Sequence, residues 1–449
     1  MPKLAIIGDG YSAAVLVYHL IKGKFNPRDI TVFGPNVLGL GQAYGSQHDH
    51  YRLNVRDNLM RIDPDAPDDF TQWAKANIDD PDAHVEAGAF FKRRDFARYI
   101  TSKIAAITQP TPIKQVKETV NSISRQHHWR LATDSGEYDA EIMVVATGNP
   151  ASVLNFNGDN AAAPFITRQP WRGDWEKRIS PQDDLVIIGG GLTAMDILSS
   201  LAASQHQGHV RVVTPQGVLP PPQLNWQDHA THGFEWPEVN TAAELTHIMK
   251  TVMTNNGNGQ GWLNRHGQEQ FERLRKGISP VWRHLPEAEQ LRLKRHLGWL
   301  WQLLRYRAAP QTVSAQEQMT AKGQLSIIKD RVMAVDALSP SENGHPLQVR
   351  LKKGSDLAAH HVFVATGAGR DPLLAQMAST GVLALKQGHA VVDDSLHLMA
   401  PDGTAYHDGF ALGPPTVMSR GDVIGATTIA GEALLIAKQI TTNNRLSGV

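Results

Sequence analysis

The sequence of 449 residues contains no cysteine. This absence excludes disulfide bonds, thiolate zinc sites, cysteine-ligated iron–sulfur clusters and a catalytic thiol. A net charge is also absent, because Lys and Arg together number 44 and so do Asp and Glu. The chain therefore lacks the overall field that would draw it to nucleic acid or to an anionic membrane.

Long apolar runs are missing as well, so no membrane span is predicted. A short apolar strand followed by a glycine turn begins at Leu4, which argues against a signal peptide and favours a soluble cytoplasmic protein. No Ser-His-Asp elbow, Walker loop or zinc-helix motif occurs. The densest histidine groups, in 47–51 and 228–232, have no third ligand at a metal-binding spacing, so no metal site is expected.

What the chain does contain is one device in two copies. An apolar run at 4–7 leads into Gly8-Asp9-Gly10-Tyr11-Ser12-Ala13, and a second at 185–188 leads into Gly189-Gly190-Gly191-Leu192-Thr193-Ala194. In G-x-G-x-x-A the first glycine permits a tight turn, the second lets backbone approach a pyrophosphate, and the alanine packs the helix on the strand. Two copies in a strand–turn–helix context predict two dinucleotide sites, most simply one FAD and one nicotinamide dinucleotide.

A second repeated segment supports this interpretation. "IMVVATGNP" at 142–150 and "HVFVATGAGRDP" at 361–372 both place Ala-Thr-Gly after an apolar strand. Such strand ends bring backbone close to a bound dinucleotide, because glycine has no side chain to obstruct it.

These motifs resemble the family of FAD/NAD(P)-binding flavoproteins that includes amino-acid N-hydroxylating monooxygenase-like members. The resemblance extends over nearly the whole chain. It includes "GLGQAYG" (39–45), "YRLNVRDNLM" (51–60), "DDFTQWAK" (68–75), "FKRRDFARYI" (91–100), "SPVWRHLP" (279–286), "RHLGWLWQLLRYRAAP" (295–310), "FALGPP" (410–415) and "IGATTIAGEALLIA" (424–437). It implies that 42–44 and 53–55 lie against the flavin and that 412–414 closes the FAD site.

The predicted site follows from the motifs and the resemblance together. The residues expected to bind the cofactors are Gly8, Gly10, Tyr11, Ser12, Ala13, Gln42, Leu53, Asn54, Val55, Thr147, Gly148, Gly189, Gly191, Leu192, Thr193, Ala194, Gly367, Leu412, Gly413 and Pro414. Tyr44 and Asn54 are the candidates for the catalytic environment of the flavin ring. Arg305 and Arg307 are candidates for an anionic group of the substrate or a cofactor phosphate.

Three departures from the family pattern affect this assignment. The acid that usually follows the second strand and binds ribose is replaced by Gly34, which leaves backbone or Asn36 to hold the ribose. In the second copy the equivalent position is Thr214, which favours NADPH and leaves NADH open; the nearby Arg211 lies earlier in its strand. The family's Phe-x-Gly fingerprint is met only by 156–158, without the following histidine.

The fold expected is α/β, with two Rossmann-like dinucleotide-binding domains in a nested, glutathione-reductase-like arrangement. We expect residues 1–150 to begin the FAD domain, 151–330 to form an inserted NAD(P) domain after an irregular linker at 155–181, and 331–449 to complete the FAD domain. A mostly helical insert at 240–308 interrupts the second domain.

The helical insert is basic, with nine Lys or Arg and three Asp or Glu between 272 and 307. Leucines at 293, 297, 300 and 304 recur at helical spacing, which predicts one buried face. A solvated charged face with Trp282, Trp299 and Trp301 packed inward is the first interpretation. Steering of an anionic substrate is the second, and nucleic-acid binding is a distant third.

Three functions remain open at this level. The resemblance implies an FAD monooxygenase in which NAD(P)H reduces the flavin, oxygen forms a flavin hydroperoxide, and oxygen moves to a small polar substrate such as an amine or an amino-acid nitrogen. The second is a flavin NAD(P)H oxidoreductase with a non-oxygen acceptor. The third is a non-catalytic dinucleotide-binding redox sensor. The partners expected are the small-molecule substrate and O2, without nucleic acid or membrane; the sequence does not fix the oligomeric state.

Overall fold

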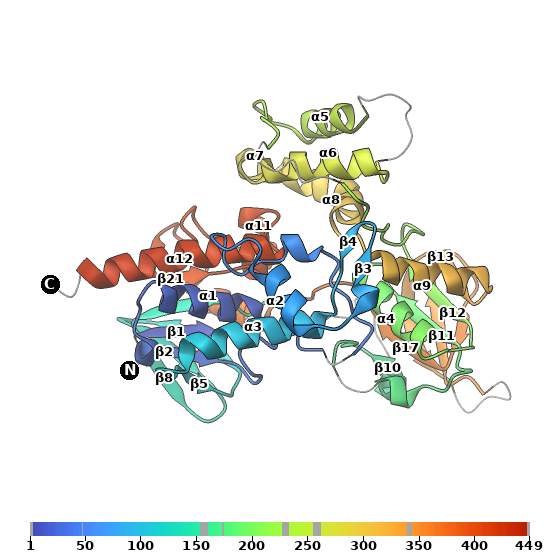
Figure 1. Cartoon of the computed structure of the whole chain (residues 1–449), viewed down its shortest axis with the longest axis horizontal. Coiled ribbons are helices and arrows are strands. Elements are labelled where there is room, and N and C mark those ends of the chain that lie inside the picture. The colour runs from blue at the N-terminus through green and yellow to red at the C-terminus, as the bar shows by residue number, and fades with distance from the viewer. Residues whose placement is uncertain are drawn as a thin grey trace.

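A computed structural model describes residues 3–46, 48–152, 160–172, 175–226, 233–254, 262–338 and 344–446. It is an α/β structure built on two mainly parallel sheets, one in each half of the molecule (Figure 1). The first sheet has the order β20-β21-β9-β1-β2-β5 and the second the order β10-β17-β11-β12-β13. The α/β class and the two Rossmann-like units predicted from the sequence are confirmed.

The first sheet joins both ends of the chain. Its strands are β1 (Leu4–Ile7), β2 (Ile30–Phe33), β5 (Lys114–Val116), β9 (Ile142–Val145), β20 (His397–Met399) and β21 (Ala405–Ala411). All neighbours are parallel except β20 and β21, and every residue of β1 is buried, as expected for a strand covered on both faces. The helices of this unit are α1 (Tyr11–Lys22), α2 (Asp69–Asn77), α3 (Arg93–Thr108), α10 (Pro372–Ser379), α11 (Val417–Arg420) and α12 (Ala426–Leu446).

The second sheet is entirely parallel. Its strands are β10 (Ile166–Thr167), β11 (Leu185–Ile188), β12 (Val210–Thr214), β13 (Leu325–Lys329) and β17 (His361–Val364), with helices α4 (Leu192–Ala203) and α9 (Pro310–Ala321). Alternate residues of β11 enter two different cores. Leu185 and Ile187 pack with α4 and α9, while Val186 and Ile188 pack with β14 (Val332–Ala337) and β15 (Leu347–Leu351). This is the period-2 alternation of a strand buried on both faces.

Sheet membership differs from the boundary expected at residue 330. Strand β17 pairs with β11 in register from His361 to Val364, so the second unit reaches Val364. Sequence order alone could not assign this strand, because parallel partners are joined through long connections. The linker is also less irregular than expected, since β10 adds an edge strand to the second sheet; residues 153–159 and 173–174 lie outside the described residues.

The insert contains α5 (Ala242–Thr254), α6 (Arg265–Lys276), α7 (Ile278–His284) and α8 (Glu287–Arg305), which cluster beyond the two sheets (Figure 1). Leu293 and Leu304 of α8 are buried, while Leu297 and Leu300 are partly buried against the same helical cores. The inward packing expected for three tryptophans holds for Trp282 and Trp301 but is wrong for Trp299, which is 40% exposed.

The smaller sheets complete the structure. They are β3 (His84–Val85) with β4 (Gly88–Ala89), β6 (Ser122–Arg125) with β7 (Trp129–Ala132) and β8 (Glu137–Ala140), β14 and β15 with β16 (Leu357–Ala359), and β18 (Leu385–Lys386) with β19 (His389–Ala390). Across the described ranges, none of the helices has both the length and the apolar character needed to cross a bilayer.

Candidate dinucleotide sites

The two glycine turns lie at the carboxyl ends of β1 and β11 and share one backbone arrangement. Gly8 has φ +118° and Gly189 has φ +107°, both in the region that favours glycine. A Cβ on Gly8 would lie 2.3 Å from the carbonyl oxygen of Ala146, and one on Gly189 would lie 2.2 Å from that of Ala365. The first position of each motif must therefore be glycine, because the carbonyl oxygen of the alanine in an Ala-Thr-Gly segment leaves no room for a Cβ.

The helices that follow begin without a side-chain cap. Gly10 is the N-cap of α1 and Gly191 the N-cap of α4, and neither helix has a side-chain hydrogen bond at its cap. The first backbone N–H groups of a helix have no partner within it, and they favour a phosphate. Predicted residues Tyr11, Ser12 and Ala13 supply this turn in α1; Leu192, Thr193 and Ala194 supply it in α4. Both turns thus fit a pyrophosphate.

The two Ala-Thr-Gly segments meet in space. Ser152 donates a hydrogen bond to the carbonyl of Gly367 at 2.6 Å, which connects the chain after the first segment to the second. Gly148 and Gly367 both have positive φ, and a Cβ on either would meet nothing within 4 Å. Thr147 donates to the Asp371 carboxylate at 2.5 Å. These predicted residues lie where the two units join.

The loop expected against the flavin packs on the first glycine turn. A Cβ on Gly41 would lie 2.6 Å from Cα of Gly10, so the two backbones touch. In the same loop, half-buried Gln42 precedes Tyr44, whose ring packs edge-on against Tyr11 with centroids 5.5 Å apart. Burial raises the pKa of Tyr44 to about 12, so its hydroxyl can donate a hydrogen bond but cannot act as a base near neutral pH.

Asn54 follows buried Leu53, whose backbone N–H donates to Phe91 at 2.8 Å, and precedes half-buried Val55. Within the described ranges the Asn54 side chain makes no hydrogen bond, so it does not stabilise the turn in which it lies. Its amide is therefore available to a bound group.

The C-terminal part closes the same edge of the first sheet. Leu412 donates its N–H to Val145 at 2.9 Å, and Gly413 has φ +72°. A Cβ on Gly413 would lie 3.0 Å from Oγ of Ser12, in the first turn of α1. Pro414 is buried directly after it. The segment 412–414 is thus next to the predicted pyrophosphate turn.

The corner where a ribose would lie differs between the copies. A Cβ on Gly34 would lie 2.5 Å from a carboxylate oxygen of Asp9, and that carboxylate accepts from the Asn36 backbone N–H at 2.5 Å. In the second copy a Cβ on Gly190 would lie 3.1 Å from Cβ of Thr214. Sequence reasoning missed the Asp9 position, because nothing in the motif shows where its middle side chain points.

Two cations on the strands beside the second corner differ in position: Arg211 is the register partner of Val186 near the amino end of β11, whereas Lys329 lies at the carboxyl end of β13. Arg211 lies 3.6 Å from the Asp184 carboxylate, so it has an internal partner. Lys329 is exposed, ends β13 and is the register partner of Thr214. It was missed because β13 lies more than a hundred residues after β12 in the chain. Its position at this corner follows from the register of the β12–β13 pairing.

The structure gives Arg305 and Arg307 internal partners, contrary to the role expected for them. Arg305 binds Asp422 at 2.9 Å, and Arg307 binds Glu272 at 2.5 Å; both guanidinium groups are nearly buried. Burial alone would raise the pKa of Glu272, but Arg275 and Arg307 lower it to about 2. Part of the positive charge of the insert is therefore neutralised in an ion-pair network. We propose that Arg305 and Arg307 anchor the insert through this network.

An ion pair connects the two units beside the glycine turns. Arg93, in the first turn of α3, lies 2.7 Å from the Asp196 carboxylate of α4. Burial raises the pKa of Asp196 to about 6, although Arg93 opposes the shift. In the first unit, burial raises the pKa of Glu432 to about 7; its carboxylate accepts from Gly413 at 3.4 Å.

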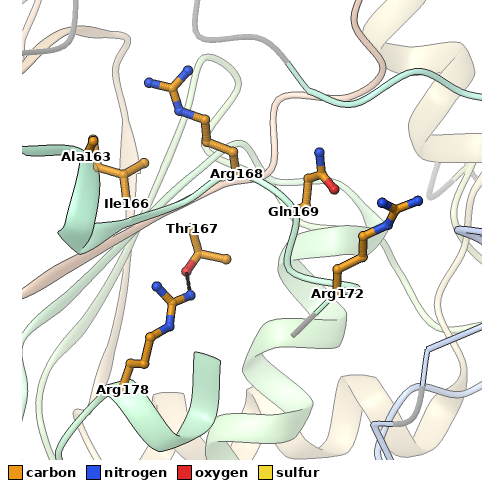
Figure 2. A pocket seen from close by; sticks show the side chains of 7 residues that line it. All are labelled: Ala163, Ile166, Thr167, Arg168, Gln169, Arg172 and Arg178. Atoms are coloured by element: carbon orange, nitrogen blue, oxygen red, sulfur yellow. Dashed lines mark hydrogen bonds between the residues drawn. The ribbon is translucent and has the colours of Figure 1, made fainter. Parts of the chain in front are cut away.

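A hollow of about 390 Å³ lies at the carboxyl end of β10 (Figure 2). Three exposed arginines line it, at 168, 172 and 178. Arg178 donates to Thr167 Oγ1 at 3.0 Å, and Thr167 lies 2.7 Å from His361 Nε2. Burial, with Arg178 nearby, lowers the pKa of His361 to about 4, so this histidine is neutral and can accept from Thr167.

No group of three metal-ligating side chains occurs within the described ranges. Of the two histidine groups, His48 lies 3.2 Å from the Glu176 carboxylate, whereas Gln47 and 228–232 lie outside the described residues. The 156–158 fingerprint lies outside them too.

Two mainly parallel sheets, each with a glycine turn and an uncapped helix at its carboxyl edge, define a two-dinucleotide-binding α/β protein. Residues 5–150 match the model of an FAD-NAD(P)-binding family. No curated protein matches the chain in sequence.

Solved structures share the fold over nearly the whole chain. The FAD-bound cadaverine monooxygenase DfoA of Erwinia amylovora has a TM-score of 0.65 at 12% identity, covering 98% of this chain and 95% of that one. The ornithine hydroxylase PvdA of Pseudomonas aeruginosa has a TM-score of 0.64 at 14% identity, covering 98% and 99%. Lactococcus lactis thioredoxin reductase has a TM-score of 0.55 at 11% identity, covering 100% of both chains. At these identities the likeness establishes the fold alone.

Proposed function

We propose that this chain is an FAD-dependent oxidoreductase reduced by NAD(P)H, with FAD in the first unit and the nicotinamide cofactor in the second. The observation that carries the proposal is the repeated turn, in which Gly8 and Gly189 pack against the carbonyls of Ala146 and Ala365. The family match of residues 5–150 supports the assignment of the first unit.

In the first unit, the turn from Gly8 to Ala13 would hold the FAD pyrophosphate, and Gly413 would close over it. Bound FAD would supply the acceptor for hydride and the reaction with oxygen. The contribution of this chain is to orient and enclose the ring. Tyr44 offers a neutral hydroxyl donor, and Asn54 offers an amide that has no hydrogen-bond partner among the described residues. In the second unit, Gly191 and Thr193 would hold the pyrophosphate of the nicotinamide cofactor.

For the electron acceptor we propose oxygen, with an oxygen atom transferred to a small amine or amino-acid nitrogen. Two observations support this choice over a disulfide. The chain has no cysteine to relay electrons as a dithiol. The amine-hydroxylating structures also share the fold with higher TM-scores than the thioredoxin reductase.

The second candidate is an NAD(P)H oxidoreductase with a small non-oxygen acceptor. The full-length likeness to a structure named as a thioredoxin reductase supports it. A non-catalytic redox sensor is the third candidate, and its only support is the absence of an acid at Gly34 and of a phosphate-binding arginine after β12.

An anionic group on the substrate has a candidate position in the arginine-lined hollow beside β10. Arg168 and Arg172 have no carboxylate partner within the described ranges, and Arg178 is held by Thr167. This hollow replaces Arg305 and Arg307 in the proposed substrate site, because those two are paired internally.

The first experiment is anaerobic mixing of the purified protein with NADPH and, separately, with NADH. Bleaching of the flavin absorbance is expected with at least one of them. Addition of ¹⁸O₂ and a panel of amines, diamines and amino acids should then give ¹⁸O-labelled product. Protein without flavin would overturn the FAD assignment. Reduction followed only by peroxide release with every substrate would overturn oxygen transfer and favour the second candidate.

The arginine hollow has its own control in this assay. Arg168→Gln together with Arg172→Gln should raise KM for an anionic substrate several-fold at unchanged kcat, while flavin reduction by the nicotinamide cofactor stays at the wild-type rate. The matched variant is Arg130→Gln, because Arg130 is also exposed but lies on β7 and pairs with Asp139. An equal change in KM for both variants would remove the hollow from the proposed site.

A further inference from the structure

The first unit has glycine where a strand-end acid usually binds ribose, yet a carboxylate is present at that position. The side chain of Asp9, from inside the glycine turn, occupies the space next to Gly34: a Cβ there would lie 2.5 Å from both Cγ and Oδ2. Asn36 fixes this carboxylate through its backbone N–H, 2.5 Å from Oδ2, and its side-chain Nδ2, 3.1 Å from the same atom. Asp9 is 7% exposed, so the group is held rather than free in solvent.

The second unit reverses this arrangement. The position equivalent to Asp9 is Gly190, and the position equivalent to Gly34 is Thr214. A Cβ on Gly190 would lie 3.1 Å from both Cβ and Oγ1 of Thr214, and 3.0 Å from the Val218 carbonyl. The two positions touch in each copy, so only one of them can carry a side chain. The first copy carries an acid on the turn, and the second carries a neutral hydroxyl on the strand.

We propose that Asp9 takes the place of the missing strand-end acid, holds the adenosine ribose hydroxyls of the dinucleotide in the first unit, and excludes one that carries a 2′-phosphate. The proposal rests on the assignment of FAD to this unit and extends it to cofactor selection. Position 34 is then glycine because the Asp9 side chain on the turn occupies the space that a side chain there would need.

The chemistry favours this role for a fixed carboxylate. A carboxylate accepts two hydroxyl donors, and hydrogen bonds to a charged group are stronger than those between neutral groups. The same charge repels a phosphate in the same corner. Because the second corner has Thr214 and Gly190 without an acid, that corner tolerates a 2′-phosphate. The pair of sites would therefore sort FAD from NADPH by the charge at one position.

The test is a titration of flavin-stripped protein with FAD, in which flavin fluorescence reports binding. Asp9→Asn should weaken FAD binding about tenfold or more, the usual worth of a hydrogen bond to a charged group. It should leave FMN binding unchanged, since FMN lacks the adenosine ribose. FAD lacking the adenosine 2′-hydroxyl should bind the wild-type protein about tenfold more weakly, but bind Asp9→Asn as well as FAD does. Moving the acid to the strand, Asp9→Gly with Gly34→Asp, should restore affinity for FAD.

Two results would overturn the proposal. One is unchanged FAD affinity in Asp9→Asn. The other is an equal loss for FAD and FMN, with the 2′-hydroxyl still contributing in the variant, which would mean that Asp9 only fixes the Asn36 loop. If wild-type protein binds no FAD, the proposed function fails separately. ADP-ribose and 2′-phospho-ADP-ribose then carry the test: only the wild-type first site should reject the 2′-phosphate, and an Asp9→Asn variant with the same selectivity would refute the proposal.

Discussion

The two glycine turns share their backbone and differ in their side chains. Each first glycine is forced by a carbonyl of an Ala-Thr-Gly segment, at 2.3 Å for Gly8 and 2.2 Å for Gly189. Each receives the same ladder contact: Gly8 donates to Phe33 at 2.8 Å and Gly189 to Val213 at 2.9 Å. Contacts that build the turn are kept in both copies. The side chains beside the turns have diverged, with Asp9 and Gly34 in the first copy and Gly190 and Thr214 in the second. We propose that this difference selects the dinucleotide that each copy takes.

The surroundings of the turns also differ. The first has a loop packed on it, with Gly41 touching Gly10, and an aromatic group around Tyr11 and Tyr44. At the second, a Cβ on Gly191 would meet nothing within 4 Å. The first site is therefore enclosed by protein, as suits a cofactor that stays bound. Among the described residues none packs on Gly191 of the second turn, which fits our proposal that the second cofactor enters and leaves in every turnover.

The largest effect should come from breaking each turn in the same way. Gly8→Ala and Gly189→Ala each place a Cβ against a backbone oxygen at positive φ, which should cost about 2–5 kcal/mol of unfolding free energy. Gly8→Ala should purify without flavin. Gly189→Ala should keep flavin but lose its reduction by the nicotinamide cofactor. Urea unfolding, flavin content and anaerobic reduction measure the three quantities.

The matched control is Gly136→Ala, because Gly136 has no positive φ and a Cβ there would meet nothing within 4 Å. It should behave as wild type in all three assays. If Gly189→Ala were reduced at the wild-type rate, the second turn would not be a nicotinamide site.

The repeated turn was predictable because its requirements are local: apolar strand, glycines at fixed offsets, then a helix. Other parts depend on distant pairing. Strand β17 belongs to the second sheet only through its register with β11, and Lys329 reaches Thr214 only through the β12–β13 ladder. Arg305 has the composition of a substrate ligand, but a carboxylate more than a hundred residues later, Asp422, neutralises it. Side-chain direction within the turn, as at Asp9, has no sequence signal.

The next prediction concerns the ion pair between α3 and α4, formed by Arg93 and Asp196. Folding raises the pKa of Asp196 from 3.8 to about 6, so between about pH 4 and 6 the folded chain keeps a proton that the unfolded chain releases. The stability that protonated Asp196 contributes is fully present below its unfolded pKa and is lost as the pH rises through its folded pKa. Unfolding free energy should fall across this window by up to about 3 kcal/mol.

Asp196→Asn removes this titration. The unfolding free energy should therefore fall less steeply between pH 4 and 6 in the variant than in the wild type, as measured by urea unfolding at each pH. The pKa of Glu432 is also raised by burial, but Glu432 contributes equally to both proteins, so its effect cancels when they are compared. Asp139→Asn, at an exposed carboxylate paired with Arg130, is the control and should leave the slope unchanged. An unchanged slope in Asp196→Asn would show that the buried pair stays ionised.

A smaller effect should separate folding from binding at the open turn. Gly191→Ala adds a Cβ into free space at an ordinary φ of −91°, so unfolding free energy should change by less than about 1 kcal/mol. Binding of the nicotinamide cofactor should weaken about tenfold, because the second glycine permits the pyrophosphate to approach backbone. Calorimetric titration with the flavin in place measures this. Unchanged affinity would move the pyrophosphate away from Gly191.

The smallest effect concerns the choice between NADPH and NADH. Lys329 is exposed at the carboxyl end of β13 beside Thr214, where a 2′-phosphate would lie if the adenosine ribose occupies this corner. Lys329→Gln should reduce the preference for NADPH over NADH about two- to fivefold, since exposed ion pairs contribute little, and added salt should diminish the difference. Lys322→Gln removes an equal charge beyond the amino end of β13 and should leave the preference unchanged. An equal loss for both nucleotides in Lys329→Gln would mean that the lysine acts on a phosphate common to both, and the second corner would then owe its selectivity to Thr214 and Gly190 alone.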